Sequence, residues 1–232
     1  MLSKKNVIIS VFILLNSFFL AAQNKNNLPI GVFDSGTGGL TVLQAMLTLD
    51  AFNNTTGIVG ADGKPDFEKE IFQYLADQAN MPYGNYAAEQ KTDLLKEHIL
   101  KNMDFLLNNL YAQNAVNNWK SANKSPVKMI VIACNTATAY ALEDIRKQLK
   151  YLQKNIACIG VIEAGAKAAI LQQKKTPGSI GVFATAGTVA SNGYPKALIK
   201  MGKEMGLGDL QIVSQGGVGL AESIDRDWSF FV

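Results

Sequence analysis

The chain has 232 residues, 48% of them hydrophobic, which is enough for one or two domains with a sizeable core. Its formal net charge is +3, and it falls to +1 (20 basic against 19 acidic residues) without Lys4 and Lys5 of the leader. A nearly neutral chain without a basic run lacks the positive charge that binds a phosphate backbone. The composition therefore argues against a nucleic-acid partner.

Residues 1–22 have the order of charge, apolar core and small residues that is typical of a secretory signal peptide. Two lysines precede a mostly apolar run at 7–20, and two alanines follow it. The alternative is a membrane anchor, but the run is shorter than the roughly 20 residues that a spanning helix needs. We therefore expect cleavage near Gln23, a periplasmic or secreted mature protein, and no membrane attachment after cleavage.

After the leader, strand-like and helix-like patterns alternate along the chain. A continuous β-branched run such as 127–134 is typical of a strand buried on both faces. This alternation predicts an α/β fold with a parallel, helix-covered sheet, in which ligands bind at the carboxyl ends of the strands. In chain order we expect strand 29–33, helix 40–49, polar loop 50–66, an ambiguous segment 67–77, helix 88–112, polar loop 112–126, strand 127–134, helix 137–152, strand 156–162, helix 164–173, strand 179–185, helix 193–205 and strand 210–216.

The loop FDSGTGG follows the first of these strands and precedes the first helix. It fits neither fingerprint of a phosphate-binding loop, because Thr41 stands where a dinucleotide site needs its third glycine and no lysine follows the glycines. Asp34 would also repel a phosphate. With Ser35 it places a carboxylate and a hydroxyl at the end of the strand, and the helix amino terminus there favours a small anion such as a carboxylate.

Cys134 falls where a strand ends and a helix begins, and it is one of two cysteines, the other being Cys158. Two cysteines are few for a disulfide-stabilised exported domain, so we favour free thiols over a bridge between them. The N–H groups of a helix start are expected to lower the pKa of the Cys134 thiol. Asn135 and Thr136 add an amide and a hydroxyl beside it. The alternative is a small core residue.

Five ordered blocks between residues 29 and 205 resemble the glutamate racemase family, within the cofactor-independent aspartate/glutamate racemase superfamily. They are IGVFDSGTGGLTVL, MPYG, VIACNTATAYALEDIR, IGVIEAGAKAA and IGVFATAGTVASNGYPKAL. The resemblance implies two flavodoxin-like parallel-sheet domains, at 28–155 and 156–232, with the active site between them. It also implies a small amino-acid substrate and no pyridoxal phosphate, other cofactor or metal.

The family inverts the α carbon of an amino acid, so one proton must leave from one face and another return on the opposite face. The family uses two cysteines for this, and donors around the substrate carboxylate stabilise the carbanionic transition state. Cys134 matches the first cysteine, and Asp34 matches the acid that assists it. The positions that match groups holding the substrate are Ser35, Tyr83, Gly84, Asn135 and Thr136, with Thr188 as a further hydroxyl.

The second-cysteine block of the family, of the type G-C-T-H-Y-P, is not found in this sequence. Cys158 is expected in the core, and His98, the single histidine, on a solvated helix face. Glu222 either matches the glutamate that supports the family's second-site histidine, as a catalytic residue, or is an ordinary helix residue. Because the second-cysteine block is missing from the sequence, we expect a truncated, incomplete second domain with exposed apolar surface and an unpaired sheet edge.

The resemblance implies an amino-acid racemase that interconverts L- and D-glutamate and supplies D-glutamate for peptidoglycan in the cell wall, with activity impaired by truncation. Two alternatives stay open: a one-cysteine enzyme of the superfamily (a decarboxylase or another isomerase) and a non-catalytic periplasmic amino-acid binder. The sequence also leaves open whether the substrate is glutamate, aspartate or a derivative, and whether the chain forms a homodimer.

Overall fold

The computed structural model of the chain describes residues 27–112, 119–219 and 223–224. The predicted signal peptide at 1–22 and the predicted role of Glu222 fall outside these ranges and stay predictions. Within the described ranges, no helix is long and apolar enough to cross a membrane.

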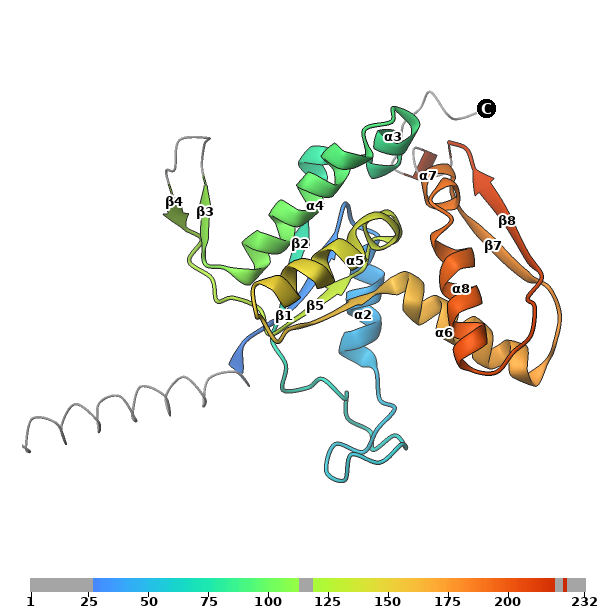
Figure 1. Cartoon of the computed structure of the whole chain (residues 1–232). Helices are drawn as coiled ribbons and strands as arrows, with labels where there is room; N and C mark the ends of the chain where they lie inside the picture. The colour runs from blue at the N-terminus through green and yellow to red at the C-terminus, as the bar shows by residue number, and fades with distance from the viewer. Residues whose placement is uncertain (1–26, 113–118, 220–222, 225–232) are drawn as a thin grey trace, which may run out of the picture.

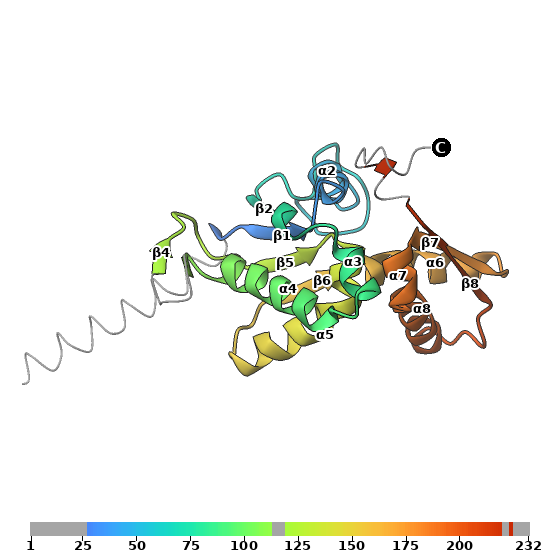
Figure 2. The ribbon, with the colours of Figure 1, turned by 90° about the horizontal axis from the view of Figure 1, so that it is seen from above.

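The main sheet has four parallel strands in the order β2-β1-β5-β6. Figure 1 labels β1, β2 and β5, and Figure 2 also labels β6. β1 pairs with β5 so that Phe33 lies opposite Ile132. The carboxyl ends of these two strands therefore meet at the same edge of the sheet. The segment at 67–77, ambiguous from sequence, contains strand β2. The bounds are β1 (Ile30–Asp34), β2 (Phe72–Ala76), β5 (Met129–Ile132) and β6 (Ala157–Gly160).

Helices cover both faces of this sheet (Figure 2). Because side chains along a strand alternate between its faces, β1 directs Phe33 to one side and Ile30 and Val32 to the other. Phe33 packs with α4 and α5, and the other two pack with α2. These cores on both faces hold the ends of β1 and β5 in place. The helix bounds are α2 (Gly39–Thr48), α4 (Thr92–Leu107) and α5 (Asn135–Tyr151).

A second α/β unit follows β6. Its strands β7 and β8 pair in parallel, with Ile180 opposite Ile212, and α6 and α8 pack on one face of them around Ile170 and Leu198. Parallel strands covered by helices confirm the predicted α/β fold class. The bounds are α6 (Val161–Lys175), β7 (Ile180–Thr185), α7 (Ala186–Ala190), α8 (Gly193–Glu204) and β8 (Ile212–Gly217).

The other face of the β7–β8 sheet carries apolar side chains that no helix of the described residues covers. Phe183 is 67% exposed and Val213 is 65% exposed, although both lie in strands. They alternate along the strands with Val182 and Ile212, which face α6 and α8. An uncovered apolar sheet face of this kind is what the sequence led us to expect for the second domain.

Strand β6 belongs to the main sheet, although the predicted second domain begins at residue 156. Cys158 lies opposite Ile130 of β5, and the polypeptide enters the second unit only with α6. The hydrogen bonds of β6 place it beside β5. The domain limits 28–155 and 156–232 stay a prediction. The chain thus crosses between the two units directly after Gly160.

Two segments expected as loops have more structure than the sequence indicated. Strands β3 (Leu110–Ala112) and β4 (Trp119–Ser121) form an antiparallel pair, so β4 lies within the predicted polar loop 112–126. In the excursion 50–66, carboxylates bind the loop's own backbone. Asp50 accepts N–H groups of residues 62 and 63, and Asp66 accepts those of residues 51 and 52.

Candidate active site

The carboxyl ends of β1 and β5 bring Ser35 and Cys134 together from positions 99 residues apart. Ser35 Oγ lies 3.5 Å from Cys134 Sγ. Asp34 is the last residue of β1, and Cys134 directly precedes α5. The parallel pairing of the two strands therefore assembles a carboxylate, a hydroxyl and a thiol at one edge of the sheet.

Asp34 binds the amides of its own loop. Its Oδ1 accepts the N–H of Ser35 at 2.8 Å, and its Oδ2 accepts the N–H of Gly39, the first residue of α2, at 2.7 Å. A Cβ on residue 39 would lie 2.7 Å from the Cβ of Asp34 and 2.9 Å from that of Ala133, so this position requires glycine. These two amides are occupied by Asp34 and do not bind a phosphate.

Tyr74 is a site residue that the sequence pattern does not reveal, because it lies in the ambiguous segment that contains β2. Its hydroxyl donates a 2.9 Å hydrogen bond to the carbonyl of Gly36 and so holds the FDSGTGG loop from the neighbouring strand. Burial and the nearby Asp34 carboxylate raise the pKa of Tyr74 to about 12. The phenol is therefore a hydrogen-bond donor throughout the neutral range.

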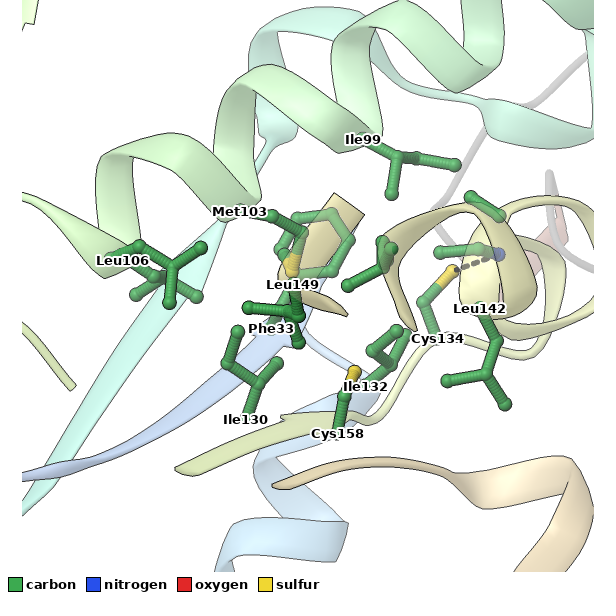
Figure 3. Close-up of a cluster of buried hydrophobic side chains, with 14 of the residues drawn as sticks. Phe33, Ile99, Met103, Leu106, Ile130, Ile132, Cys134, Leu142, Leu149 and Cys158 are labelled. Carbon is green, nitrogen blue, oxygen red and sulfur yellow. Dashed lines mark hydrogen bonds between the residues drawn. The ribbon is translucent and has the colours of Figure 1, made fainter. Parts of the chain in front are cut away.

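Cys134 is buried at the start of α5, and its Sγ accepts the N–H of Ala137 at 3.4 Å, the bond drawn in Figure 3. Burial raises the pKa of this thiol, while the Ser35 hydroxyl and the Ala137 N–H act in the opposite direction and Asp34 raises it further. The expectation that the helix start lowers the pKa was wrong in its net sign. The helix N–H does stabilise the thiolate, but desolvation has the larger effect.

Tyr83, at the start of α3 (Tyr83–Ala88), directs its hydroxyl into the protein. The hydroxyl donates a 2.6 Å hydrogen bond to Oδ2 of buried Asp77, which also accepts the side-chain amides of Asn80 and Asn102. The backbone N–H of Asp77 in turn donates to the carbonyl of Asp34. The phenol thus anchors the MPYG turn. Because the hydroxyl is bound to Asp77, the turn can offer a ligand only its backbone groups. The MPYG motif does not indicate the Asp77 network.

Gly84 lies against the second unit of the chain. A Cβ on Gly187 of α7 would lie 2.9 Å from the Cα of Gly84, so the two backbones touch where neither residue has a side chain. This contact places the MPYG turn beside α7. The first and second units therefore meet at the same end of the main sheet at which Cys134 lies.

The two residues after Cys134 also contact the second unit. Thr136 Oγ1 lies 3.3 Å from Thr188 Oγ1, and both residues are buried. Thr188 in turn accepts a 3.0 Å hydrogen bond from Thr185. Asn135 Oδ1 accepts a 2.8 Å hydrogen bond from the hydroxyl of Tyr194. Thr188 was matched from sequence, whereas Thr185 and Tyr194 were missed because nothing in sequence spacing joins them to α5.

Cys158 lies apart from this site, inside the core of the main sheet (Figure 3). Burial raises its pKa to about 12, and both cysteines are free thiols, as we favoured from the sequence. His98 packs edge to face on Tyr86 instead of lying on a fully solvated face. Within the described ranges, no group of three acidic, histidine or cysteine side chains is placed to hold a metal ion.

The fold and the site define an α/β protein with a buried thiol at the carboxyl edge of a parallel sheet, next to a carboxylate and several hydroxyls. The Asp/Glu/Hydantoin racemase family matches residues 108–227, just over half of the 232 residues. The chain belongs to this family, which confirms the resemblance stated from the sequence blocks.

Individual relatives point to one branch of the family. A glutamate racemase from Oceanobacillus iheyensis is 35% identical over 172 residues, which cover 74% of this chain and 47% of that protein. A glutamate racemase from Lactiplantibacillus plantarum is 34% identical over 174 residues, which cover 75% of this chain and 48% of that protein. A solved glutamate racemase isoform from Bacillus anthracis has a TM-score of 0.60 at 29% identity, and covers 88% of this chain and 58% of that one. The chain spans about half the length of the curated relatives that it matches.

Proposed function

We propose that this protein is a glutamate-racemase-like isomerase in which Cys134 transfers the proton at the α carbon of glutamate. The observation that carries the proposal is the 3.5 Å contact between Cys134 Sγ and Ser35 Oγ at the end of β1 and β5, beside Asp34. The similarity to glutamate racemases supports glutamate as the substrate.

The surroundings of Cys134 suit removal of a weakly acidic proton. The Cα–H of an amino acid is a poor acid, so the base must be strong, and a buried thiolate with a raised pKa is a stronger base than a solvated one. In this step the thiolate takes the Cα proton and becomes a thiol, while the electron pair of the C–H bond moves into the substrate carboxylate. Hydroxyls and amides at the site then stabilise that charge.

Inversion also needs a proton donor on the opposite face of the α carbon. Cys158, the second cysteine of the chain, lies in the core and is not this donor. We therefore expect this chain to exchange the Cα hydrogen from the Cys134 face faster than it inverts the centre. A one-cysteine enzyme, in which Cys134 alone transfers the proton, is the second candidate function.

The test is incubation with L- and D-glutamate in heavy water, with deuterium uptake followed by mass spectrometry and inversion by chiral chromatography. Cys134→Ser is expected to lower uptake by about 10²–10⁴-fold, the usual contribution of a catalytic base. Because burial raises the pKa of Cys134, wild-type uptake should still be rising above the ordinary thiol pKa of about 8.5.

The matched control is Cys158→Ala, which removes the sulfur in the core and should keep uptake close to the wild type. Uptake that survives Cys134→Ser unchanged would contradict the proposal. Glutamate binding without any uptake, equal in the wild type and Cys134→Ser, would instead identify an amino-acid binder.

We also propose that the protein is exported and that its D-glutamate chemistry serves the bacterial cell wall. The order of charged, apolar and small residues at 1–22 supports export. Expressed in a Gram-negative host, the full chain is expected in the periplasmic fraction with its amino terminus near Gln23. Amino-terminal sequencing checks this, and an intact Met1 on cytoplasmic protein would refute export.

A further inference from the structure

Asn135 presents an unpartnered amide nitrogen beside the reactive thiol. It is the first residue of α5, directly after Cys134, and its side chain is exposed. Its Oδ1 accepts the 2.8 Å hydrogen bond from Tyr194. In the part of the chain that the structure describes, no group accepts a hydrogen bond from its Nδ2. Both N–H donors of the amide are therefore available to a ligand.

Tyr194 reaches this amide from the second unit and is held there by close packing. Its ring lies against α6, where a Cβ on Gly165 would come within 3.4 Å of the ring carbon Cε1. The preceding residue, Gly193, begins α8, and a Cβ there would lie 2.9 Å from the Cβ of Ala139 in α5. The backbone of α8 thus sits directly on α5, which fixes how far the phenol extends.

The phenol settles which end of the amide faces outward. The Tyr194 hydroxyl donates its proton to Oδ1 of Asn135, and burial raises the pKa of Tyr194, so the phenol stays protonated and can keep this bond at neutral pH. If the amide turned over, the phenol would lose Oδ1 as the acceptor of its proton, and the amide oxygen would point towards the ligand. The contact with Tyr194 therefore leaves the Asn135 amide with its N–H donors, rather than its oxygen, available to a ligand.

We infer that Tyr194 is a positioning residue that holds the Asn135 amide with its two N–H donors towards the carboxylate of the amino acid bound beside Cys134. This inference rests on the proposed function, because it assumes an amino-acid ligand at that site. Donors directed at a carboxylate form the stronger, charge-assisted class of hydrogen bond, whereas an amide oxygen in the same place would repel the carboxylate. Affinity for the substrate therefore depends on a side chain from the second unit.

The test is a double-mutant cycle on glutamate binding, measured by calorimetric titration of the full chain. Tyr194→Phe removes only the hydroxyl and is expected to weaken binding about fivefold, the equivalent of one hydrogen bond of about 1 kcal/mol. Asn135→Ala should weaken it more, and the double variant should bind as Asn135→Ala does, because the phenol acts only through the amide. In the exchange assay, Tyr194→Phe should raise KM and leave kcat nearly unchanged.

Tyr151→Phe is the matched control, since Tyr151 lies at the exposed end of α5 with 86% of its surface accessible, and it should bind as the wild type does. Thermal unfolding of each variant reports whether it is folded. The inference would be overturned if Tyr194→Phe bound glutamate with wild-type affinity. It would also be overturned if the loss of binding free energy in the double variant equalled the sum of the losses in the two single variants.

Titration with glutarate, which keeps both carboxylates and lacks the amino group, separates this inference from the proposed function. A wild-type protein that binds glutamate or glutarate without deuterium uptake contradicts the racemase chemistry, yet the Tyr194→Phe effect on binding still supports the inference. A wild-type protein that binds neither carboxylate overturns the inference as well.

Discussion

The Asp34→Asn variant is expected to take up deuterium at the α carbon of glutamate about a hundredfold more slowly than the wild type, the lower end of what an acid–base group contributes. Both oxygens of Asp34 accept backbone N–H groups, from Ser35 and Gly39. Asparagine has only one such oxygen, so its NH₂ group would face a backbone donor. The loop would then move Ser35 away from Cys134, and the negative charge beside the thiol would be lost.

Asp66→Asn is the control that separates catalysis from folding. Asp66 also accepts two backbone N–H groups, those of Ala51 and Phe52, but it lies in the excursion 50–66 away from the thiol. Both variants should lose stability through the same chemical change, as measured by urea unfolding. Only Asp34→Asn should lose deuterium uptake, and equal uptake in the two variants would refute a role of Asp34 at the site.

Local sequence patterns were sufficient to predict the parallel sheet and the grouping of Asp34, Ser35 and Cys134 at the site. The β-branched run that forms β5 and the alternation of strands and helices indicated parallel strands. Such strands place their carboxyl ends at one edge of a sheet. The sequence pattern does not tell which of these ends are neighbours. Asp34, Ser35 and Cys134 could be grouped on this basis, because each directly ends or follows a strand. The structure adds the pairing of β1 with β5 that makes Ser35 and Cys134 neighbours.

What the sequence did not predict depends on contacts between distant segments. Tyr74 supports the FDSGTGG loop only because β2 lies next to β1, and Tyr194 meets Asn135 only because α8 packs on α5. The hydroxyl of Tyr83 bonds to Asp77, a partner that the MPYG motif does not indicate. The predicted direction of the Cys134 pKa shift was wrong for a related reason. The helix start is visible in the sequence, whereas the degree of burial that outweighs it is a property of the folded chain.

The Gly160→Ala variant is expected to lose about 2–3 kcal/mol of unfolding free energy, as overpacked cores typically do. Gly160 ends β6 where the chain crosses into α6, and its φ of −108° and ψ of 147° suit alanine, so backbone strain contributes nothing. The cost comes from contact. A Cβ there would lie only 2.3 Å from Cγ2 of Thr138 and 3.1 Å from Leu142.

Thr138 cannot turn aside cheaply, because its hydroxyl donates to the carbonyl of Cys134 at 2.8 Å and also contacts that of Ile132. Adding Thr138→Ser to Gly160→Ala removes the clashing methyl group and keeps the hydroxyl, so it should restore part of the lost stability. Gly178→Ala, where a Cβ meets nothing within 4 Å, is the control that should leave urea unfolding nearly unchanged. Because Thr138 follows Cys134 by one helical turn, the clash should also lower deuterium uptake. A Gly160→Ala protein as stable as the wild type would mean that β6 does not approach α5 this closely, and the crossing between the two units would then have a different geometry.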